Sequence, residues 1–216
     1  MSQPATVRID FVSDVACPWC AVGLASLERA LDALKDEVRA EIHFQPFELN
    51  PQMPREGEDV GEHIAKKYGM SPAQLAQNQE AIRQRGAAVG FTFANQDTRR
   101  IYNTFDAHRL LHWAEDTGRQ HALKRALLAA YFTDGEDVSA HDVLARVAAS
   151  VGLDGAQARS VLASDRYAQD VRAQEQFFLR AGIHSVPAII IDRQHLISGG
   201  QPPEVFEQAL RQLAAR

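Results

Sequence analysis

The chain has 216 residues, of which 45% are hydrophobic and 24% are charged, a composition typical of a globular protein that buries a sizeable core. The formal net charge of −5 argues against nucleic acid as the main partner, because no basic surface is available to neutralise phosphates. No run of about 18 apolar residues occurs, and the N-terminus lacks a basic region followed by an apolar run, so we expect no membrane span, no secretory signal and a cytoplasmic location.

The first predicted elements are a strand, a helix and a second strand. Residues 7–12 alternate apolar and polar side chains, as a half-buried strand does. Residues 18–34 predict a helix that begins at a proline, because the first helical turn does not use the N–H that proline lacks. Residues 40–44 predict the second strand, and a proline-rich loop follows it. The buried stripe of the predicted helix, with spacings of three and four, consists of Leu24, Leu27, Leu31 and Leu34.

The middle of the chain, from about residue 60 to residue 165, predicts helices almost throughout. Serine, aspartate or glycine residues mark the expected starts and ends, and Ser71 is the expected N-cap of the second helix. Two helices are expected within residues 60–90, and one each within 99–118, 121–135, 139–152 and 154–164.

Strands return in the last part of the chain. A helix is expected within residues 167–182, and the apolar run 188–191 predicts a strand that is buried on both faces. A short strand and turn follow, and residues 203–213 predict the last helix. The expected order is therefore β-α-β, a long helical insertion, and then α-β-β-α, which is an α/β fold.

The chain has only two cysteines, Cys17 and Cys20, and they lie where the first strand ends and the first helix begins. A reducing compartment disfavours a structural disulfide, and a bridge that closes so short a loop stabilises little. A helix N-terminus favours a thiolate over a thiol. We therefore interpret Cys17 as an exposed nucleophile and Cys20 as a more buried resolving thiol, with Pro18 stiffening the turn and Trp19 placing an apolar surface beside the sulfur.

Two other interpretations of the cysteines remain open at this stage: a pair of buried structural thiols, and half of a zinc site. Zinc requires four ligands, the chain has no second CxxC pair, and no histidine has the spacing of a zinc finger, so we expect no metal. A second feature supports the redox interpretation. Pro187 stands at the head of the strand expected at 188–191, where its missing N–H is tolerated, although an ordinary trans-proline turn fits the same residues.

Six segments in the same order resemble the thioredoxin superfamily and, within it, the DsbA-like group with a helical insertion. The likeness is greatest to the FrnE-type DsbA family oxidoreductases and covers nearly the whole chain. The segments are DFVSDVACPWCAVG (10–23), FQPFELNP (44–51), NTFDAHRLLHWA (103–114), AYFTDGEDVS (130–139), GIHSVPAIII (182–191) and SGGQPPEVF (198–206).

This resemblance implies a thioredoxin fold with a helical insertion after its second strand. Residues 1–52 and 166–216 would form the thioredoxin-like domain, and residues 53–165 the insertion. It implies that the Val186–Pro187 bond is cis and lies against the two thiols, with the Val186 backbone offering an N–H and a C=O to an extended substrate. The catalytic residues would then be Cys17, Cys20 and Pro187, and the substrate-binding residues Pro18, Trp19, Ser185 and Val186.

The chain departs from these relatives at two points. Ser185 stands where relatives usually have glycine, and its side chain would narrow the groove or add a hydrogen bond. Some FrnE-like proteins carry a second cysteine pair, which this chain lacks, so we expect any activity that depends on that pair to be missing.

Several polar residues near the cysteines have two interpretations. Asp10 and Asp14 would carry protons to or from Cys20, or else be solvated or capping acids. Asn103 and His108 would line the groove above the thiols, or else serve as a helix cap and a core residue. His184 lies close to the expected site in sequence, but an ordinary loop histidine is the better interpretation.

The leading functional hypothesis is a thiol–disulfide oxidoreductase or isomerase that acts on protein disulfides without a bound cofactor. Glutathione or a thioredoxin-type protein would be its reductant. The alternative is a glutathione-dependent isomerase or transferase, like the kappa-class transferases and the 2-hydroxychromene-2-carboxylate isomerases, but those enzymes tend to use serine where Cys17 stands. A redox-sensing or chaperone-like binding protein is a third hypothesis, although nothing in the predicted insertion indicates an exposed hydrophobic surface.

Overall fold

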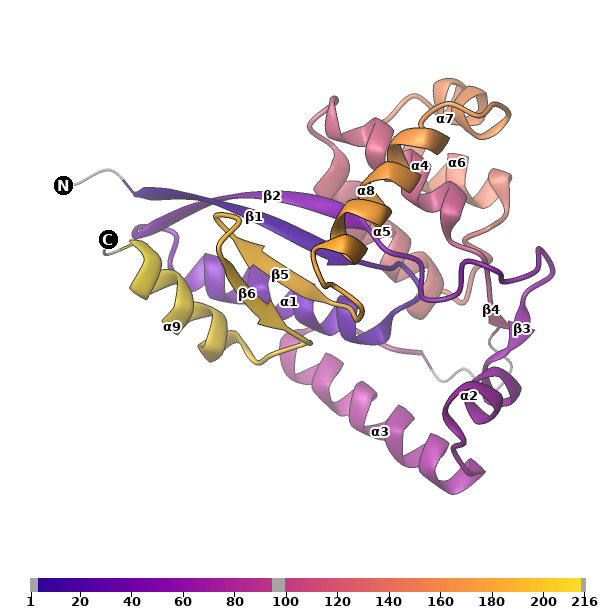
Figure 1. Cartoon of the computed structure of the whole chain (residues 1–216), viewed down its shortest axis with the longest axis horizontal. Coiled ribbons are helices and arrows are strands. Elements are labelled where there is room, and N and C mark those ends of the chain that lie inside the picture. The colour runs from indigo at the N-terminus through magenta and orange to yellow at the C-terminus, as the bar shows by residue number, and fades with distance from the viewer. Residues whose placement is uncertain (1–3, 95–99, 215–216) are drawn as a thin grey trace.

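A computed structural model describes residues 4–94 and 100–214 of the chain. Its main sheet has four strands in the order β2-β1-β5-β6 (Figure 1). β1 pairs with β2 in parallel, and the other two pairings are antiparallel. The strands are β1 (Ala5–Ser13), β2 (Val38–Pro46), β5 (Ala188–Ile191) and β6 (His195–Ser198).

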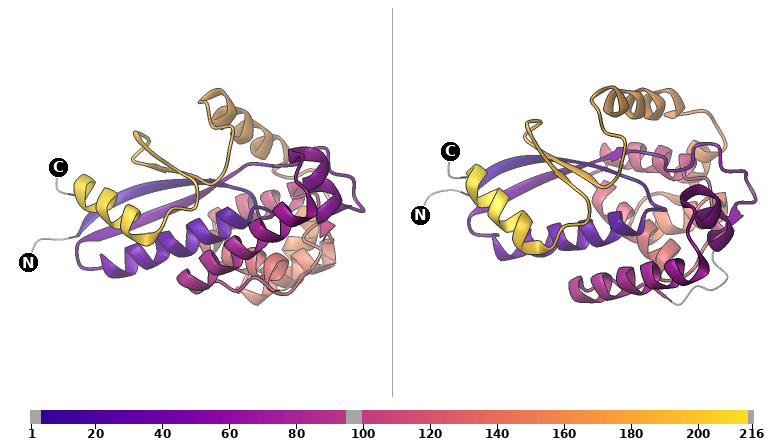
Figure 2. Two further views of the ribbon diagram at one scale, coloured as in Figure 1. Left: turned by 90° about the horizontal axis from the view of Figure 1, so that it is seen from below. Right: turned by 60° about the horizontal axis from the view of Figure 1, so that its bottom comes forward.

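Three helices cover the two faces of this sheet. α1 (Pro18–Ala33) and α9 (Pro203–Ala214) lie on one face, and α8 (Ala168–Arg180) lies on the other (Figure 2). The connection β1-α1-β2 returns the chain parallel to itself, as the predicted order required. The expected α/β fold with a helical insertion is therefore confirmed, as is the order along the chain of the elements before and after the insertion. The expected strand at 188–191 is β5, and three of its four residues are buried.

The segment between β2 and α8 consists mainly of helices, as expected. In the described residues it also contains a small two-stranded antiparallel sheet. Its elements are β3 (Glu58–Asp59), α2 (Val60–Tyr68), α3 (Pro72–Val89), β4 (Arg100–Ile101), α4 (Phe105–Glu115), α5 (Gln120–Phe132), α6 (His141–Ser150) and α7 (Gly155–Leu162).

The N-terminal ends of two inserted helices show where the local sequence predicted the start of a helix correctly and where it did not. Ser71 caps α3 as expected, and it forms a capping box in which Gln74 donates its backbone N–H to the Ser71 hydroxyl while its side chain binds the Ser71 N–H. The helix expected within 99–118 begins only at Phe105, so its predicted start is wrong. Ile101 instead pairs with Glu58 in the small sheet. Residue 99 lies outside the described residues.

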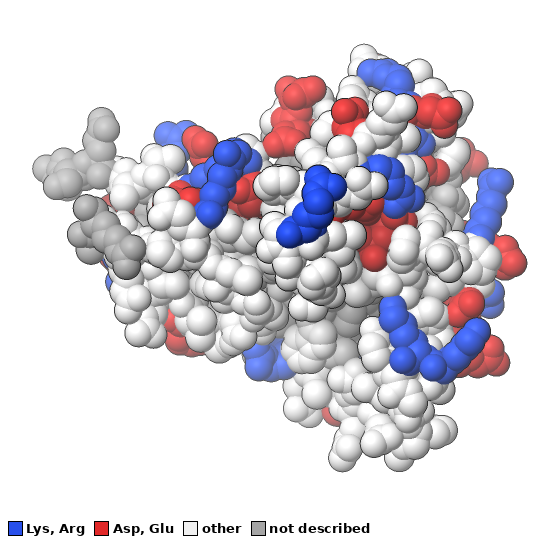
Figure 3. Space-filling model, viewed as in Figure 1, with Lys and Arg blue, Asp and Glu red and all other residues white. Residues whose placement is uncertain are grey.

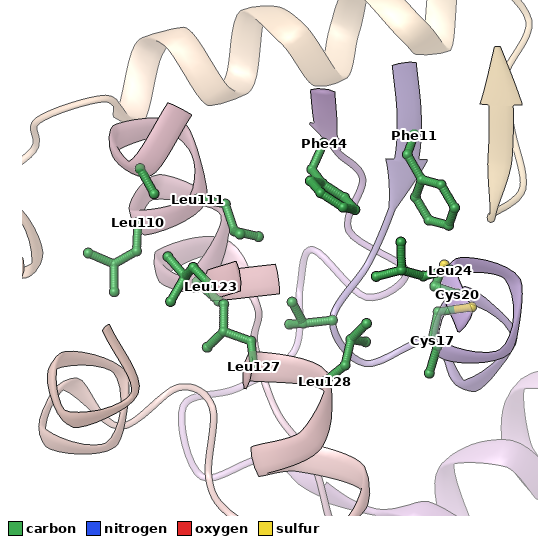
Figure 4. Close-up of a cluster of buried hydrophobic side chains, with 14 of the residues drawn as sticks. Phe11, Cys17, Cys20, Leu24, Phe44, Leu110, Leu111, Leu123, Leu127 and Leu128 are labelled. Atoms are coloured by element: carbon green, nitrogen blue, oxygen red, sulfur yellow. The ribbon is translucent and has the colours of Figure 1, made fainter. Parts of the chain in front are cut away.

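One hydrophobic core runs through both the strand–helix part and the inserted helices. Phe11 and Phe44 from the sheet and Leu24 from α1 belong to the same buried cluster as Leu123 and Leu127 from α5 (Figure 4). The inserted helices therefore pack directly onto the elements that hold the two cysteines.

The surface shows no segregation of charge on the face seen in Figure 3, where acidic and basic side chains are intermingled. Within residues 4–94 and 100–214, no helix is both long and apolar enough to cross a membrane.

Candidate active site

The two cysteines lie at the junction of β1 and α1. Cys17 is the N-cap of α1, with the extended backbone angles φ −95° and ψ 113°, and Pro18 occupies the first helical position. The Cys17 carbonyl accepts the backbone N–H of Cys20 at 3.0 Å, which closes the first turn. Cys20 therefore lies one helical turn after Cys17, and both cysteines lie at the N-terminal, positive end of the α1 dipole.

Both cysteines are free thiols, and both are buried. Cys17 is 4% exposed and Cys20 is 0% exposed, so the expectation of an exposed Cys17 is wrong for this conformation. The reason is a contact from a distant part of the chain, because the Cys17 Sγ lies 3.7 Å from the carbonyl oxygen of Val186. Figure 4 shows both sulfur atoms on the α1 side of the core cluster.

The segment before β5 forms the other wall of the site. The Val186–Pro187 peptide bond is cis, Val186 is half-buried and Pro187 is buried. Pro187 packs closely on α1 because Gly23 has no side chain. A Cβ added at Gly23 would lie only 3.2 Å from the Pro187 Cγ.

The remaining predicted site residues lie around this contact. Pro18 and Trp19 are half-buried, and Ser185 and His184 are exposed on the loop that leads to Pro187. The structure therefore brings Cys17 and Val186 together directly, and it places Ser185 in the adjoining loop.

A second glycine contact was not anticipated from the sequence. Gly200, in the turn between β6 and α9, lies against the first turn of α1. A Cβ added there would be 2.9 Å from the Trp19 carbonyl oxygen. The pair of glycines at 199–200 follows a short strand, so the sequence indicated a turn, but it did not indicate that the turn touches α1.

Burial controls the chemistry of Cys20. Removal from water raises the pKa of the Cys20 thiol well above its usual range, and the hydrogen bond to Cys17 and the negative charge on Cys17 raise it further. The positive charge of Lys124 and the backbone N–H of Asp14 act in the opposite direction. Cys20 is therefore held in its thiol form in the reduced protein, and it must lose its proton before it can act as a nucleophile.

The buried carboxyl group of Asp14 accepts backbone hydrogen bonds at the turn before Cys17. Its Oδ2 accepts the backbone N–H of Leu49 at 2.7 Å, and its Oδ1 lies 3.5 Å from the Nε2 of the buried His108. Burial raises the pKa of Asp14, but His108, the Leu49 N–H and Thr104 outweigh this effect, so the pKa is lowered overall. Asp14 is 1% exposed and Asp10 is 4% exposed, so the interpretation of these two residues as solvated acids is wrong.

The other polar residues considered from the sequence have structural contacts. Asp10 accepts hydrogen bonds from the Arg8 guanidinium and from the Gln45 side chain, both at 2.8 Å. Asn103 accepts the backbone N–H of Phe105 at 2.9 Å, which places it at the start of α4. His108 is buried at 2% exposure, and its Nε2 lies 3.5 Å from the Asp14 Oδ1.

Two buried carboxyl groups, those of Glu48 and Glu175, share a half-exposed arginine. Arg172, on α8, binds both Glu48 and Glu175, and its contact to Glu175 is 2.8 Å long. Burial is the largest influence on both carboxyl groups, and it raises the pKa of Glu48 and of Glu175 despite the arginine.

Lys124 is the site residue that the sequence analysis missed. It is completely buried in α5, and burial lowers the pKa of its amine, while the nearby acidic groups Cys20, Asp14 and Cys17 act in the opposite direction. A signal was present, because Lys124 lies three and four residues before Leu127 and Leu128 and next to Leu123, on the apolar stripe of its helix. In the described part of the chain, no three His, Cys, Asp or Glu side chains are grouped so that they could hold a metal ion.

Comparisons with known proteins give a consistent result. Residues 8–211 match the family model described as DSBA-like thioredoxin domain. The protein YwbO of Bacillus subtilis (strain 168), described as uncharacterized, is 30% identical over 207 residues, which cover 95% of this chain and 96% of that protein.

Two solved structures show how far the likeness extends. The probable DsbA oxidoreductase SCO1869 from Streptomyces coelicolor has a TM-score of 0.90 and 38% identity, over 97% of this chain and 91% of that chain. A 2-hydroxychromene-2-carboxylate isomerase has a TM-score of 0.72, over 95% of each chain, but only 14% identity. The second match shows a shared fold alone.

Proposed function

The chain belongs to the family of DSBA-like thioredoxin domains, and we propose that it is a thiol–disulfide oxidoreductase that exchanges the disulfides of protein substrates through Cys17 and Cys20. The observation that carries this proposal is the contact of 3.7 Å between the Cys17 Sγ and the Val186 carbonyl, with the second free thiol one helical turn deeper. A nucleophilic sulfur thus lies beside a backbone segment that can hold an extended peptide.

In the first step, the Cys17 thiolate attacks one sulfur of a substrate disulfide. A disulfide forms between Cys17 and that sulfur, and the other substrate sulfur leaves as a thiolate. The N-terminus of α1 favours the negative charge on Cys17, and the first turn of the helix contains no acidic residue that would oppose it. The N–H and C=O of Val186 pair with the substrate backbone and align its disulfide with Cys17.

In the second step, Cys20 loses its proton and attacks the Sγ of Cys17. The Cys17–Cys20 disulfide forms, the bond to the substrate breaks, and the second substrate sulfur leaves as a thiolate. The cysteine pair gives up two electrons and the substrate gains them. The reverse sequence oxidises a dithiol, and a substrate thiol that attacks the mixed disulfide before Cys20 does so would give isomerisation.

Reduction of insulin disulfides and refolding of scrambled ribonuclease test the proposal. The wild-type protein should catalyse one or both reactions, and the Cys17→Ser variant should show only the uncatalysed rate. Equal rates for the two proteins would reject the proposed function.

The proposal includes a reducing, cytoplasmic setting, with glutathione or a thioredoxin-type protein as the electron donor and an assignment to the FrnE-like type. The net direction of electron flow depends on the reduction potential, for which about 30 mV corresponds to roughly 1.4 kcal/mol. A redox titration of the cysteine pair by gel shift measures it. A glutathione-driven cycle requires that glutathione reduce the Cys17–Cys20 disulfide in that titration.

The fold shared with the 2-hydroxychromene-2-carboxylate isomerase supports a second candidate, a glutathione-dependent isomerase or transferase. In that reaction the glutathione sulfur is the nucleophile and the protein only stabilises it, so a serine at position 17 would serve. Tight glutathione binding together with turnover of a small-molecule substrate by Cys17→Ser would favour this candidate. Loss of all turnover in Cys17→Ser favours the oxidoreductase.

A further inference from the structure

The turn that carries Cys17 has no helix cap of its own. Cys17 occupies the N-cap position of α1, where serine, threonine, aspartate or asparagine usually accepts a backbone N–H of the first turn, and its side chain makes no such hydrogen bond. The sulfur that acts as the nucleophile therefore does not also fix the start of its helix. Another group must hold residues 14–17, which connect the end of β1 to α1.

Asp14 supplies hydrogen bonds that hold this turn. Its Oδ1 accepts the backbone N–H of Ala16 at 3.3 Å, and its backbone carbonyl accepts the N–H of Cys17 at 3.3 Å. The second carboxylate oxygen, Oδ2, reaches out of the turn and accepts the N–H of Leu49, in the segment after β2, at 2.7 Å. One side chain thus joins the turn of Cys17 to a distant segment of the chain.

The same carboxylate faces the start of α4, in the helical insertion. The Nε2 of His108 lies 3.5 Å from the Asp14 Oδ1, and Asp14 is only 1% exposed. Burial disfavours the charged carboxylate, but His108, the Leu49 N–H and Thr104 outweigh burial, so the pKa of Asp14 is lowered and the side chain keeps its charge. An ionised carboxylate therefore links three parts of the chain around the cysteine turn.

The opposite wall of the site is fixed independently of Asp14. Val186, whose carbonyl oxygen lies 3.7 Å from the Cys17 Sγ, stands two residues before β5. β5 pairs with β1, with Ala188 opposite Val12, so the sheet sets the position of Val186. The hydrogen bonds of Asp14 set the position of Cys17. The gap between a substrate backbone held at Val186 and the attacking sulfur depends on both.

We infer that Asp14 is a positioning residue for the attack of Cys17 on a peptide disulfide, an inference that rests on the proposed function. In this step a bond forms between the Cys17 Sγ and one substrate sulfur, the substrate S–S bond breaks, and the other sulfur leaves with the electron pair. Asp14 exchanges no proton in this step. Its carboxylate holds the Cys17 sulfur within reach of a substrate whose backbone is paired with Val186. A small disulfide without a peptide backbone does not use Val186, so its reaction does not need this alignment.

Two probes with the same leaving group separate alignment from the intrinsic reactivity of the sulfur. One is dithiobis(nitrobenzoate), a small chromogenic disulfide, and the other is an extended peptide whose single cysteine carries the same nitrobenzoate thiol. Attack of Cys17 on either probe releases the same coloured thiolate. Cys20→Ser is the parent protein for all variants, because only the first step can occur in it. The ratio of the second-order rate constants, peptide probe over small reagent, measures the alignment.

The variants differ in whether the lost carboxylate holds the turn. Asp14→Asn keeps the shape of the side chain but has one acceptor oxygen where aspartate has two, so it cannot hold both backbone N–H groups in the same way. Asp10→Asn is the matched control. Asp10 is also buried, at 4% exposure, but its carboxylate binds Arg8 and Gln45, outside the turn. A general loss of stability is therefore common to the two variants.

We expect Asp14→Asn to lower the rate constant for the peptide probe by about 10- to 10²-fold, because a displacement of about 1 Å at a reacting atom costs on the order of 10²-fold. The rate constant for the small reagent should be unchanged or higher, because a loosened turn also uncovers the sulfur. The ratio should stay at the parent value in Asp10→Asn. A purely structural role of Asp14 would leave the ratio unchanged, because unfolding exposes Cys17 to both probes alike.

A parent-like ratio in Asp14→Asn would overturn the inference. An equal fall of the ratio in Asp10→Asn would overturn it too, because the loss of any buried carboxylate would then suffice. If Asp14→Asn does not fold, Asp14→Ser decides: its shorter side chain can still accept the Ala16 N–H but does not reach Leu49, so the ratio should fall, and a parent-like ratio would overturn the inference. A parent protein in which Cys17 reacts with neither probe would instead reject the proposed function.

Discussion

Replacing Gly200 with alanine should destabilise the packing of the turn between β6 and α9 against the first turn of α1. The added Cβ would lie 2.9 Å from the Trp19 carbonyl oxygen and 3.3 Å from the Trp19 Cε3. A Cβ does not approach a backbone oxygen this closely, and that oxygen belongs to the first turn of α1. The turn between β6 and α9 must therefore move by a few tenths of an ångström, which also disturbs the hydrogen bond of 2.9 Å from Arg85 to the Gly200 carbonyl.

The expected cost of this overpacking is about 1–3 kcal/mol of unfolding free energy. For a protein of this length, each kcal/mol lowers the Tm by about 2–4 °C, so the Tm of Gly200→Ala should fall by roughly 2–12 °C. Because Trp19 stands between the two cysteines, catalysed insulin reduction should fall as well.

Gly155→Ala is the matched control, because its added Cβ would lie 3.5 Å from the Ala149 Cβ, an ordinary contact. Thermal unfolding followed by circular dichroism, with insulin reduction measured on the same samples, compares the two variants. The Tm and activity of Gly155→Ala should equal or exceed those of the wild type. If Gly200→Ala behaves like Gly155→Ala in both assays, the packing of this turn against α1 does not matter and the reasoning is refuted.

Three further substitutions probe the buried charges by denaturant unfolding at several pH values. Asp14→Asn should lose about 1–3 kcal/mol of unfolding free energy at pH 7. Because folding lowers the pKa of Asp14, the stabilisation that its carboxylate provides is complete above about pH 3.9 and is lost as the pH falls through the folded-state pKa. The difference in stability from the wild type should therefore disappear in acid, and a constant difference would contradict this. Lys124→Met should gain about 1–3 kcal/mol of unfolding free energy at pH 7, because it removes a buried amine that has no hydrogen-bond partner among the described residues. Because folding lowers the pKa of Lys124, the gain should shrink as the pH rises towards about 10.4. A loss of stability at pH 7 would show that burial of this amine is not costly. Arg172→Met should lose about 1–3 kcal/mol, because it leaves the buried carboxyl groups of Glu48 and Glu175 without a cation, while water screens the half-exposed arginine in the wild type. Acid should reduce this loss by protonating the two carboxyl groups, and an equal loss at pH 4 and pH 7 would contradict the account.

The sequence was sufficient where local pattern and local structure coincide. The alternation before Cys17, the proline at the start of α1 and the apolar run at 188–191 each describe an element whose residues determine it, and those elements are present. Ser71 is a similar case, since an N-cap depends on the residue itself and on its near neighbours.

The features that the sequence did not reveal depend on contacts between distant residues. Ile101 lies in a strand because it pairs with Glu58, although its own segment has a helical pattern. The resemblance placed the Val186–Pro187 bond against the thiols, but the sequence did not show that this contact, 3.7 Å from the Val186 carbonyl oxygen to the Cys17 Sγ, buries Cys17. Lys124 had a local signal in its position on an apolar stripe, but only the fold shows that this stripe belongs to the same buried cluster as the thiols.

Trapping the mixed disulfide tests the central claim most directly. In Cys20→Ser the second step cannot occur, so incubation of the reduced variant with a disulfide-bonded peptide should leave that peptide attached to the protein. Mass spectrometry of the proteolytic fragments should find the peptide on Cys17, and the wild type should release it and form the Cys17–Cys20 disulfide. An unmodified Cys17 in Cys20→Ser under these conditions would contradict the account.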